Sequence, residues 1–600
     1  MSTGASVGCT DHRGRPVVPR PARTVATDGS RGRPGPRGAV TGDQGDEETD
    51  VTTWNFADVW ETVADQLGEA PALVHGDQVR TWLELDRRAD NVARWLLGAG
   101  AAHQDKVALY LYNCPDYLET CFAAYKVGLV PINTNYRYAD DELAYLWENA
   151  DAVAVVFHGA FVERIEGIRH RVPGVRSWLW VDDGTAACPA WAVPYEEAAG
   201  TTGAHGASVH QRVRAPWGRG PDDVHMLYTG GTTGMPKGVM WRQDDLFARL
   251  NGGGFRKYPP EGGLADVRRE LVDRGAGMTL LPACPLMHGT GGFTAMECLA
   301  EGGHVVTLTS RQFDPVELLD TIVRRQVNGV VIVGDAFAKP ILAALDAEPG
   351  RWDLASLEAI VSSGVMWSEE SKQGLLRHHP GALLIDAFGS SEALGLGTSL
   401  SSRRGSAKTA QFRLGRDVRV VDADGGDVEP GSGRTGVLAL GGRIPLGYYK
   451  DEAKTAATFR VIDGTRYSIP GDYAEVRPDG SIHLLGRGSV CINTGGEKVY
   501  PEEVEEAVKT VPGVRDAVVV GIPHERFGEE IVAVVELERG TPGDPVTDEV
   551  VIEHVKARLA GYKAPRRVRF VPTIGRSPAG KVDYARHRGE TAEWSGVPLG

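Results

Sequence analysis

Cysteine is scarce in this sequence, and its few cysteines are scattered. Among 600 residues there are 7 cysteines, and no two of them form a Cys-x-x-Cys pair. A disulfide framework or a zinc site uses cysteines at short, regular spacings. The sequence therefore predicts reduced thiols, as in a cytoplasmic enzyme, and no structural metal. The cysteines are Cys9, Cys114, Cys121, Cys188, Cys284, Cys298 and Cys491.

Long apolar runs are also missing. No stretch of 18 or more apolar residues suggests a membrane span, and the N-terminus lacks the apolar core of a secretory signal. The last residues, GVPLG, are not a peroxisomal signal. We therefore expect a cytoplasmic protein without integral membrane association, for which any lipid contact is peripheral.

Positive charge is in deficit, because the formal net charge is −15. This balance argues against a nucleic-acid partner held by neutralised phosphates, although a local basic groove can still bind a small anion. The sequence contains no His-Glu-x-x-His helix, and its matches to Gly-x-Ser-x-Gly (residues 4–8) and to Gly-x-Gly-x-x-Gly (residues 431–436) do not lie at a predicted strand-to-helix turn. Hydrolase, zinc-protease and dehydrogenase functions thus have no support.

The chain begins with a polar segment and continues with strands and helices in alternation. Residues 1–50 are rich in Gly, Pro, Arg, Thr and Asp, a composition that predicts a disordered N-terminal extension. This extension is a regulatory tail, a dispensable addition or the product of a start codon placed too far upstream. Residues 106–112 and 152–157 have strand patterns, and residues 115–128 and 139–150 between them have helical spacing.

The same alternation returns further along the chain and predicts an α/β fold with mainly parallel, helix-covered sheets. Two other segments lack a clear period, and we expect loops there, at residues 175–222 and 252–275. The strands and helices are expected at residues 304–308, 314–326, 329–334, 335–347 and 381–389.

The pattern changes after about residue 400. Short strands and Gly-rich turns predict an antiparallel, barrel-like subdomain, with Asp479 and Gly480 in a hairpin turn. Beyond it, strands at 516–523 and 531–538 with flanking helices predict a compact α+β unit. We therefore place a large N-terminal domain at residues 51–488, a hinge near residues 487–490 and a small C-terminal domain at residues 489–600.

One glycine-rich stretch, LYTGGTTGMPKGVMW at residues 227–241, raises the question of function. Glycine lets a backbone approach a ligand closely, threonine adds hydroxyl donors, and Lys237 adds a point charge suited to a polyanion. The stretch lacks the spacing of a Walker P-loop. Taken alone, it fits either a phosphate-binding loop or a plain Gly-rich turn.

Four further motifs follow this stretch in a recognisable order. They are DAFGSSE (386–392), PGDYAEVRPDG (470–480), GRGSVCINTGGEKVYPEEVE (486–505) and SPAGKVDYARHR (577–588). Together the five resemble the ANL superfamily of adenylate-forming enzymes, in its fatty-acid and steroid-acid CoA ligase branch, over residues 54–588. The resemblance implies a large N-terminal domain of two helix-covered mixed sheets plus a β-barrel-like subdomain. A small mobile α+β C-terminal domain carrying the catalytic lysine would follow.

The motif residues also suit one reaction. Activating a carboxylate requires its oxygen to attack the α-phosphate of ATP while pyrophosphate leaves. The protein must therefore hold a triphosphate, offset its charge and exclude water. By resemblance, the ATP and AMP site consists of Thr229, Gly230, Gly231, Thr232, Thr233, Gly234, Lys237, Ser363, Gly364, Val365, Asp386, Ala387, Phe388, Gly389, Ser390, Ser391, Asp472 and Arg487.

The resemblance also implies separate roles within this site. The loop with Lys237 would hold the β- and γ-phosphates, and Glu392 would hold Mg²⁺. Phe388 would pack against adenine, although it lacks the phenolic hydroxyl common in the family, as Gly230 lacks a serine hydroxyl. Without the other motifs, Phe388 would be interpreted as a core aromatic residue and Glu392 as a charge at a helix N-terminus. Asp472 and Arg487 would bind the ribose.

Two residues carry the implied chemistry outside the nucleotide loops. Lys581 would by default be a solvated surface charge, whereas the matching lysine of the family bridges the carboxylate and the α-phosphate in the transition state. His288 matches a gate beside the acyl pocket, although a lone histidine is more often structural.

The loop after the hinge indicates the acyl acceptor. Its sequence INTGGEKVYPEEVE resembles the acyl-CoA synthetase version, in which Gly495 and Gly496 lie on the CoA side and let the thiol-bearing arm pass. Ser489 at the hinge replaces the usual Asp or Lys, and Asn493 replaces the lysine of plant-type ligases. Domain rotation and pantetheine contacts are expected to differ in detail.

The leading hypothesis is an ATP- and Mg²⁺-dependent ligase that converts a carboxylic acid to its CoA thioester through an acyl-adenylate. The alternatives are an enzyme that loads a carrier protein or, like luciferase, passes the acyl group to an oxygenation step, and a nucleotide-binding regulatory protein without activity. A long fatty acid or a steroid side-chain acid is favoured. The small residues that leave room for it are Gly252–Gly254, Gly291, Gly292, Gly334, Ala336 and Ala338.

Overall fold

The computed structural model describes most of the chain after residue 52. All described residues belong to one compact unit, Thr52–Gly600. Predictions for residues 1–50, for 230–234 and for 488–491 lie outside the described residues. The described ranges are 53–200, 211–229, 235–365, 367–487, 492–494, 497–524, 527–538, 546–559, 561–577 and 580–597.

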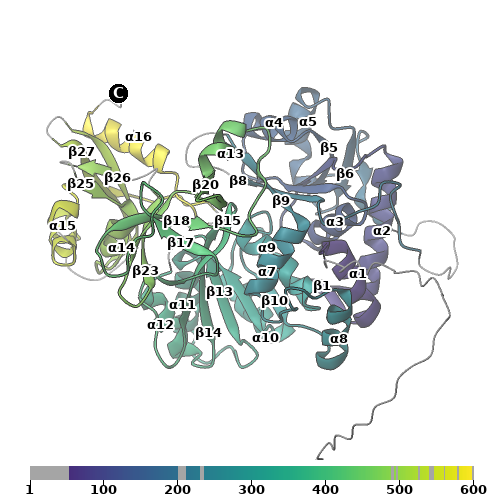
Figure 1. The fold of residues 1–600 in the computed structure, drawn as a ribbon, viewed down its shortest axis with the longest axis horizontal. Helices are drawn as coiled ribbons and strands as arrows, with labels where there is room; N and C mark the ends of the chain where they lie inside the picture. The colour runs from purple at the N-terminus through teal and green to yellow at the C-terminus, as the bar shows by residue number, and fades with distance from the viewer. Residues whose placement is uncertain are drawn as a thin grey trace, which may run out of the picture. The chain divides into compact units, whose positions relative to one another are not determined.

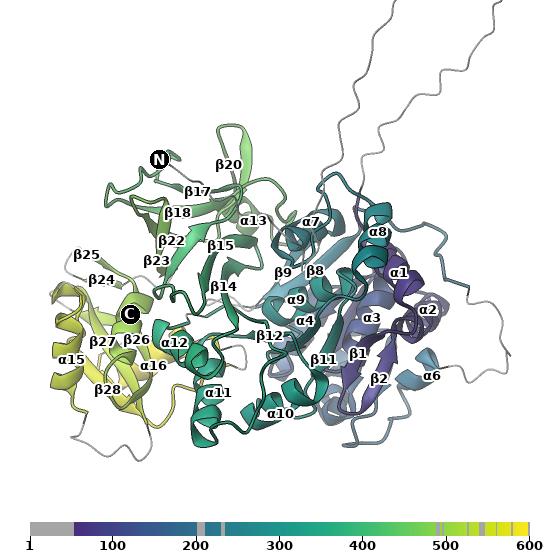
Figure 2. The same cartoon turned by 90° about the horizontal axis from the view of Figure 1, so that it is seen from below.

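A long mixed sheet forms the middle of the molecule (Figures 1 and 2). Its first part is parallel, as predicted, and it includes the pair in which Leu73 lies opposite Val305. The strands of this part lie in the order β2 (Gln78–Thr81), β1 (Pro71–His75), β11 (His304–Thr307), β10 (Thr279–Pro282), β12 (Gly329–Ile332), β13 (Ala359–Ser363) and β14 (Leu383–Ser390). Only the edge pair β1–β2 is antiparallel among them.

The second part of this sheet is antiparallel and begins where β14 turns back into β15. It continues the parallel part without a break, so the region after residue 400 shares one sheet with the preceding domain. Asp479 and Gly480 lie between β22 and β23, with Gly480 at φ +78°, as a hairpin turn requires. The order is β15 (Ala393–Ser401), β16 (Gln411–Leu414), β23 (Ser481–Arg487), β22 (Asp472–Val476), β18 (Thr435–Leu440), β21 (Thr465–Ser468) and β20 (Phe459–Ile462), and β17 (Val418–Val421) pairs with β18.

Amphipathic helices cover the parallel strands. In α10 (Pro315–Arg325), Asp314 accepts hydrogen bonds from the amides of Val316 and Glu317, and Pro315 occupies the first turn. The helix buries Leu318, Leu319 and Ile322 and ends where Gln326 adopts a left-handed conformation at φ 50°. The neighbouring helices are α9 (Gly289–Ala300), α11 (Asp335–Ala347) and α12 (Glu369–His378).

A second sheet lies in the N-terminal half and is parallel except at one end. Only β8, β9 and β19 pair antiparallel in it. The order is β19 (Gly447–Tyr448), β9 (Lys237–Arg242), β8 (Val224–Thr229), β4 (Val130–Asn133), β3 (Lys106–Tyr110), β5 (Ala152–His158), β6 (Ser177–Val181) and β7 (Val193–Pro194). Its helices include α3 (Pro115–Lys126), α4 (Asp140–Asn149), α5 (Val162–Ile168), α7 (Gln243–Gly253) and α13 (Glu452–Thr458).

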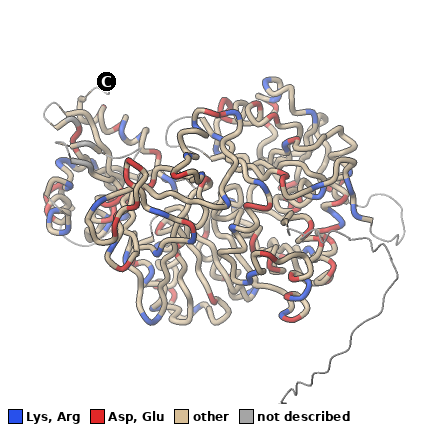
Figure 3. Tube along the Cα trace, in the orientation of Figure 1, with Lys and Arg blue, Asp and Glu red and all other residues tan. Residues whose placement is uncertain are grey.

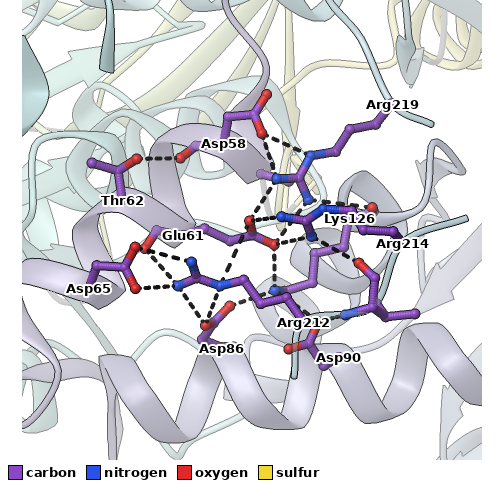
Figure 4. Close-up of polar contacts among 12 residues, drawn as sticks. Asp58, Glu61, Thr62, Asp65, Asp86, Asp90, Lys126, Arg212, Arg214 and Arg219 are labelled. Carbon is purple, nitrogen blue, oxygen red and sulfur yellow. Dashed lines mark hydrogen bonds and ion pairs between the residues drawn. The ribbon is translucent and has the colours of Figure 1, made fainter. Parts of the chain in front are cut away.

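A buried ion network joins three helices of this half, as Figure 4 shows. The ammonium of Lys126 on α3 lies 2.8 Å from Glu61 on α1 (Phe56–Leu67), and 2.5 and 3.0 Å from Asp86 and Asp90 on α2 (Trp82–Gly98). Lys126 is 1% exposed. Because three carboxylates surround it, its charge is compensated despite the burial. Arg212, Arg214 and Arg219 add further bonds to the same carboxylates and to Asp58 and Asp65.

The C-terminal segment forms a small α+β domain with its own apolar core within this unit. The long hairpin of β26 (Val514–His524) and β27 (Gly528–Leu537) is its centre, and Val519, Ala533 and Val535 are fully buried there. The prediction of a compact α+β unit is confirmed. Its other elements are β24 (Ile492–Thr494), β25 (Glu497–Val499), β28 (Arg567–Val571), α14 (Pro501–Lys509), α15 (Asp548–Lys556) and α16 (Tyr584–Ser595).

Two predicted loops contain regular structure, and this prediction was wrong in part. Residues 252–275 include α8 (Leu264–Arg274), which buries Val267 and Leu271 and packs the partly buried Leu264 against the core. These three apolar residues have helical spacing, but most of the helix is charged or polar and the apolar stripe is narrow. Residues 175–222 include the strands β6 and β7 and the short helix α6 (Tyr195–Ala199).

Other expectations can be tested on the described residues. The described cysteines Cys114, Cys121, Cys188, Cys284 and Cys298 are free thiols, as predicted. Figure 3 shows basic and acidic residues interspersed along the described elements. Within the described ranges, no helix is both long and apolar enough to cross a membrane.

Candidate active site

The ends of the glycine-rich stretch are fixed by a strand pair. Thr229 ends β8, Lys237 begins β9, and the two residues lie opposite each other in the antiparallel register. Gly230–Gly234 lie outside the described residues, so their predicted contact with phosphate stays a prediction. The Lys237 ammonium forms an ion pair with Asp451, the N-cap residue of α13. This hydrogen bond from Lys237 lowers the pKa of Asp451.

The predicted adenine loop follows β13 at the carboxyl edge of the parallel strands. Gly364 has φ +91°, a conformation that glycine adopts without strain. A Cβ added at Gly364 would lie 3.4 Å from the hydroxyl oxygen of Thr290 on α9. The loop residues Ser363, Gly364 and Val365 therefore lie against the first turn of α9. Crevices at such strand ends are the usual ligand sites of open α/β sheets.

Asp386 lies next to this loop on β14, paired with Ser362 of β13. Its side chain is buried and lies 3.4 Å from the ammonium of Lys372 on α12. Burial raises the pKa of Asp386 to about 6, although the charge of Lys372 opposes this shift. The carboxyl group of Asp386 is thus directed toward Lys372 on α12. The predicted contact with adenine would therefore come from the backbone of Asp386 and Ala387.

The turn between β14 and β15 holds the next motif residues. The rings of Phe388 and Phe412 lie 5.3 Å apart, so Phe388 packs on β16. A Cβ added at Gly389 would lie 2.9 Å from the carbonyl oxygen of Ala393, so a larger residue would disturb the turn. The Ser390 hydroxyl is buried and has no hydrogen-bond partner among the described residues.

Glu392 is positioned by neighbouring strands of both large sheets. The hydroxyl of Tyr448 on β19 donates to its carboxylate at 2.7 Å, and the hydroxyl of Ser468 on β21 donates to its carbonyl oxygen at 2.6 Å. The indole of Trp241 on β9 donates to the carbonyl oxygen of Ser391 at 2.9 Å. These three donors fix the turn and orient the Glu392 carboxylate.

The carboxylate of Glu392 fits Mg²⁺ only when other ligands accompany the ion. In the described part of the chain, no group of three or more His, Cys, Asp or Glu residues could hold a metal. Mg²⁺ commonly binds proteins through one or two carboxylates, with phosphate oxygens and water as the other ligands. The donor set therefore suits a metal that arrives with a nucleotide.

Asp472 and Arg487 meet across one strand pair. Asp472 begins β22, Arg487 ends β23, and the two residues lie directly opposite each other. Asp472 is 5% exposed, and the side chain of Arg487 lies outside the described part. Ser489, Gly495 and Gly496 lie outside the described residues altogether, as do the side-chain contacts of Asn493.

His288 lies within range of the charge of Lys581, although 293 positions separate the two residues in the sequence. His288 precedes α9 as its N-cap residue, and its buried Nε2 has no hydrogen-bond partner among the described residues. Burial lowers the pKa of His288 to about 3, and the positive charge of Lys581 lowers it as well. An imidazole with this pKa is neutral at physiological pH.

The segment before Lys581 packs against the predicted adenine loop. A Cβ added at Gly580 would lie 3.2 Å from both Val333 and Val365. The Lys581 amide donates to the Ser577 hydroxyl at 3.0 Å, and the Ser577 amide donates to the Lys581 carbonyl at 2.9 Å. This closed turn holds Lys581 beside the N-terminus of α9.

The sequence motifs did not reveal several residues that support the site. Asp451 binds Lys237, Tyr448 binds Glu392, Trp241 binds the Ser391 carbonyl, and Lys372 binds Asp386. The only signal for any of them was Asp451 before a helical pattern, which is typical of an N-cap. The contacts of Tyr448 and Trp241 join segments that are distant in the sequence, and that of Lys372 depends on how α12 packs against β14.

Comparison with known proteins identifies the family. The AMP-binding enzyme family matches residues 60–449, which is more than half of the chain. The chain belongs to the AMP-binding enzyme family. The C-terminal domain of AMP-binding enzymes matches residues 503–581, a match that includes Lys581 at its end. The predicted membership of the adenylate-forming superfamily is thereby confirmed.

Several relatives among AMP-binding enzymes align over nearly the whole chain. A 3-oxocholest-4-en-26-oate–CoA ligase of Rhodococcus rhodochrous is 40% identical over 90% of this chain and 96% of its own length. A medium/long-chain-fatty-acid–CoA/3-oxocholest-4-en-26-oate–CoA ligase of Mycolicibacterium smegmatis is 40% identical over 90% of this chain and 97% of its own length. A feruloyl-CoA synthase of Amycolatopsis is 29% identical and covers 86% of this chain and 94% of its own length.

Solved structures of similar enzymes share the fold. An anthranilate CoA ligase in complex with anthranoyl-AMP superposes with a TM-score of 0.73 at 20% identity, over 91% of this chain and 98% of that one. ATP-bound MatB from Rhodopseudomonas palustris gives a TM-score of 0.71 at 25% identity, over 90% and 99%. The predicted architecture of a large N-terminal domain and a small C-terminal domain is confirmed.

Proposed function

We propose that this AMP-binding enzyme is an ATP-dependent acid:CoA ligase that acts on medium-chain, long-chain or steroid side-chain acids. The observation that carries the proposal is the packing of Gly580, the neighbour of Lys581, against Val365 of the Gly364 loop. A mobile cation at this point can serve a reaction between a carboxylate and a phosphate. The names of the relatives at 40% identity support CoA as the acceptor and these acids as substrates.

In the first half-reaction, a substrate carboxylate oxygen attacks the α-phosphorus of ATP, and the bond to the β-phosphate oxygen breaks. Lys581 would lie between the carboxylate and the α-phosphate and stabilise the charge that develops there. Lys237, once released from Asp451, would bind the departing pyrophosphate. Glu392 would hold the Mg²⁺ that enters with ATP, and this ion would offset the charge of the phosphates.

The neutral state of His288 has a role in this step. A protonated imidazole would attract the substrate carboxylate and compete with Lys581 for it. Since burial keeps His288 uncharged, the ammonium of Lys581 remains the cation beside the reacting carboxylate. His288 would then act by shape and by hydrogen bonding at the entrance to the acyl site.

In the second half-reaction, the CoA thiolate attacks the carbonyl carbon of the acyl-adenylate, and AMP leaves with the bonding electrons of the acyl–oxygen bond. The attack of the carboxylate on ATP and the attack of the CoA thiolate on the acyl-adenylate need different protein residues at the same active site. We therefore propose that residues 489–600 rotate between them, with the hinge at Ser489, so that Lys581 withdraws and the loop with Gly495 and Gly496 replaces it.

The test measures pyrophosphate and AMP release from ATP with an acid panel, with and without CoA. Octanoate, palmitate and 3-oxocholest-4-en-26-oate are expected to give CoA-dependent AMP formation, whereas acetate and benzoate are not. If AMP forms equally without CoA, or if no acid releases pyrophosphate, the ligase proposal is wrong. A carrier-loading enzyme would release pyrophosphate but gain no turnover from free CoA.

A further inference from the structure

The turn that carries Lys581 lies in the connection between β28 and α16. Three hydrogen bonds close it from within. The amides of Lys581 and Ser577 donate to the Ser577 hydroxyl and to the Lys581 carbonyl oxygen, respectively, and the Gly580 amide donates to the Ser577 carbonyl oxygen at 2.8 Å. These three bonds fix the shape of the turn. They do not fix its orientation relative to the sheet of the small domain.

Arg576, directly before this turn, links it to the central hairpin of the domain. Its Nη1 donates to the carbonyl oxygen of Gly580 at 3.0 Å. Its Nε and Nη2 donate to the two carboxylate oxygens of Asp516 on β26 at 2.6 and 2.9 Å. A guanidinium that binds a carboxylate through two nitrogens is held in one plane, so its third nitrogen points in a defined direction. Arg576 therefore sets the position of the peptide bond between Gly580 and Lys581.

The anchor of this link, Asp516, lies on a firmly packed strand. Asp516 pairs with Glu536 in the register of β26 and β27, and the next two residues, Ala517 and Val518, are fully buried. The Ala517 amide donates to the Asp516 carboxylate at 2.8 Å. Burial would raise the pKa of Asp516, but the hydrogen bond and the charge of Arg576 lower it below its usual value. The carboxylate is therefore charged at neutral pH and holds the guanidinium in place.

The turn and its anchor both contact the large domain in the described conformation. A Cβ added at Gly580 would lie 3.2 Å from Val333 and from Val365, so the turn packs on the predicted adenine loop. The ammonium of Lys339 on α11 donates to the carbonyl oxygen of Arg515, the residue before the anchor, at 3.2 Å. The arginine thus connects two points at which the small domain meets the large one.

We propose that Arg576 is a positioning residue for Lys581 in adenylate formation. The inference rests on the proposed function, in which the Lys581 ammonium bridges the carboxylate and the α-phosphate. By holding the Gly580 carbonyl, Arg576 fixes the backbone from which the Lys581 side chain extends. Misplacement by about 1 Å at a reacting centre can lower a rate about 10²-fold. In this role Arg576 acts through Lys581 and does not touch the substrate.

A purely structural role for Arg576 predicts a different result. In that case its loss would weaken the whole small domain and would slow both half-reactions alike. The domain, however, has two apolar clusters, around Val519 and around Val520, that do not include Arg576. A variant without the guanidinium is therefore expected to fold and to keep the second half-reaction, from which Lys581 has withdrawn.

The test measures the two half-reactions separately in Arg576→Met. Single-turnover pyrophosphate release from saturating ATP and palmitate is expected to fall about 10- to 100-fold, whereas the half-saturating ATP concentration changes less than about threefold. CoA-dependent AMP release from synthetic palmitoyl-adenylate should also change less than about threefold. An equal fall in both half-reactions, or no fall in the first, overturns the inference.

A double variant shows whether Arg576 acts through the lysine. Adding Arg576→Met to Lys581→Ala should slow pyrophosphate release by less than about threefold beyond Lys581→Ala alone, because two residues that serve one interaction are not additive. A further loss of about 10-fold or more would show that Arg576 acts independently of Lys581, and it would overturn the inference.

Two further variants separate positioning from folding. Arg558→Met is the matched control, because Arg558 is an exposed arginine of the same domain that donates to the carbonyl oxygen of His554; it should change neither half-reaction. Asp516→Asn keeps the shape of the anchor and removes its charge, so the first half-reaction alone should slow, about three- to tenfold. Melting temperatures of all variants check folding.

Failure of the inference and failure of the proposed function give different results. If Lys581→Ala slows pyrophosphate release and Arg576→Met does not, the positioning role is wrong while the ligase function stands. If the wild-type enzyme releases no pyrophosphate with palmitate or with any other acid, the ligase function itself is wrong, and the positioning role falls with it.

Discussion

At the scale of single residues, the pairing of a cation with a neutral histidine decides how charge is distributed in the site. Lys581 is exposed in the described conformation and contacts Ser577 through its backbone. Burial, and then the charge of the Lys581 ammonium, lower the pKa of His288 to about 3. Of these two residues, Lys581 therefore carries the positive charge that can stabilise an anion, and His288 is neutral.

Replacing this lysine tests its role directly. Lys581→Ala is expected to lower the rate of acyl-adenylate formation about 10²- to 10³-fold, because one preorganised donor to the transition state is lost. Thioester formation from a supplied acyl-adenylate should change far less. Single-turnover pyrophosphate release measures the first step, and CoA-dependent AMP release from synthetic acyl-adenylate measures the second. Lys556→Ala, which removes an exposed lysine of α15 paired with Glu553, is the matched control.

The buried histidine makes a prediction about pH and stability. Since the pKa of His288 is about 3 in the folded chain and about 6.5 when unfolded, the unfolded state binds more protons between these values. This histidine therefore destabilises the fold as pH falls below 6.5. At pH 5 the effect is about 2 kcal/mol. His288→Gln should show a smaller fall in melting temperature from pH 7 to pH 5 than the wild type. An identical fall in both proteins would contradict the neutral, buried state of His288.

At the scale of elements, one residue, Asp451, connects helix α13 to the hairpin of β8 and β9. Asp451 caps α13 through the Lys454 amide at 2.9 Å and pairs with Lys237 at the start of β9. If Lys237 binds ATP as proposed, phosphate competes with this carboxylate for the lysine. Asp451→Ser keeps a capping oxygen and removes the competing charge. The KM for ATP should fall about two- to fivefold, as expected for a partly exposed ion pair.

The control for this prediction removes the cation instead of its competitor. Lys237→Met should raise the KM for ATP, while the melting temperature changes little because the pair is partly exposed. If Asp451→Ser instead raises the KM for ATP, Asp451 supports nucleotide binding and the competition does not exist.

The sequence predicted elements well where their apolar period was strong. The predicted helix at 335–347 coincides with α11, and the predicted strand at 152–157 lies within β5. The prediction of a loop at residues 252–275 was wrong, because α8 presents only a narrow stripe of Leu264, Val267 and Leu271 to the core among many charged residues. A strong apolar period in the sequence shows where an element begins and ends. A helix that buries few residues lacks such a period, and its position depends on the tertiary structure on which it packs.

The sequence predicted residues of the candidate site only where they lie within recognisable motifs. Glu392 and Lys581 could be proposed as site residues because they lie in recognisable stretches of sequence, and their roles stay predictions. The hydroxyl of Tyr448 on β19, which donates to Glu392 in the turn between β14 and β15, belongs to no motif. Contacts between distant strands depend on register, and register is not visible in a single sequence.

At the scale of the whole molecule, the buried network around Lys126 ties the first helices to a segment far along the chain (Figure 4). Arg212 and Asp65, 147 residues apart, bond through two nitrogens. Burial alone would raise the pKa of Glu61, but hydrogen bonds from Arg219 and Arg214 and the charge of Lys126 lower it well below its usual value. Such an ion network stabilises the fold only while every partner is present.

Removing one partner is therefore expected to be costly. Lys126→Met leaves three buried carboxylates facing an apolar side chain and should destabilise the protein by about 3–5 kcal/mol. Urea unfolding followed by tryptophan fluorescence measures this loss. Lys556→Met, at an exposed helical pair, should change stability by less than about 1 kcal/mol. Similar small values for both variants would show that the network contributes little.

The same network predicts the response to acid. The pKa of Glu61 is lower in the folded chain than its usual 4.5, so this group stabilises the fold above pH 4.5 and loses its contribution as pH falls below it. Glu61→Gln should weaken the fold at pH 7 and reduce the further loss on acidification. Unfolding midpoints at pH 7 and pH 4 check both signs.

The pairing of β1 with β11 has a consequence for biosynthesis. His75 and Thr307, joined by a hydrogen bond in this pair, are 232 positions apart. At about 5–20 residues per second, the ribosome completes β11 roughly 10–50 s after β1. During that interval the apolar edge of β1 has only β2 beside it in its sheet. The nascent chain thus depends on chaperones, or on early docking of α1 and α2, until the middle of the polypeptide has emerged.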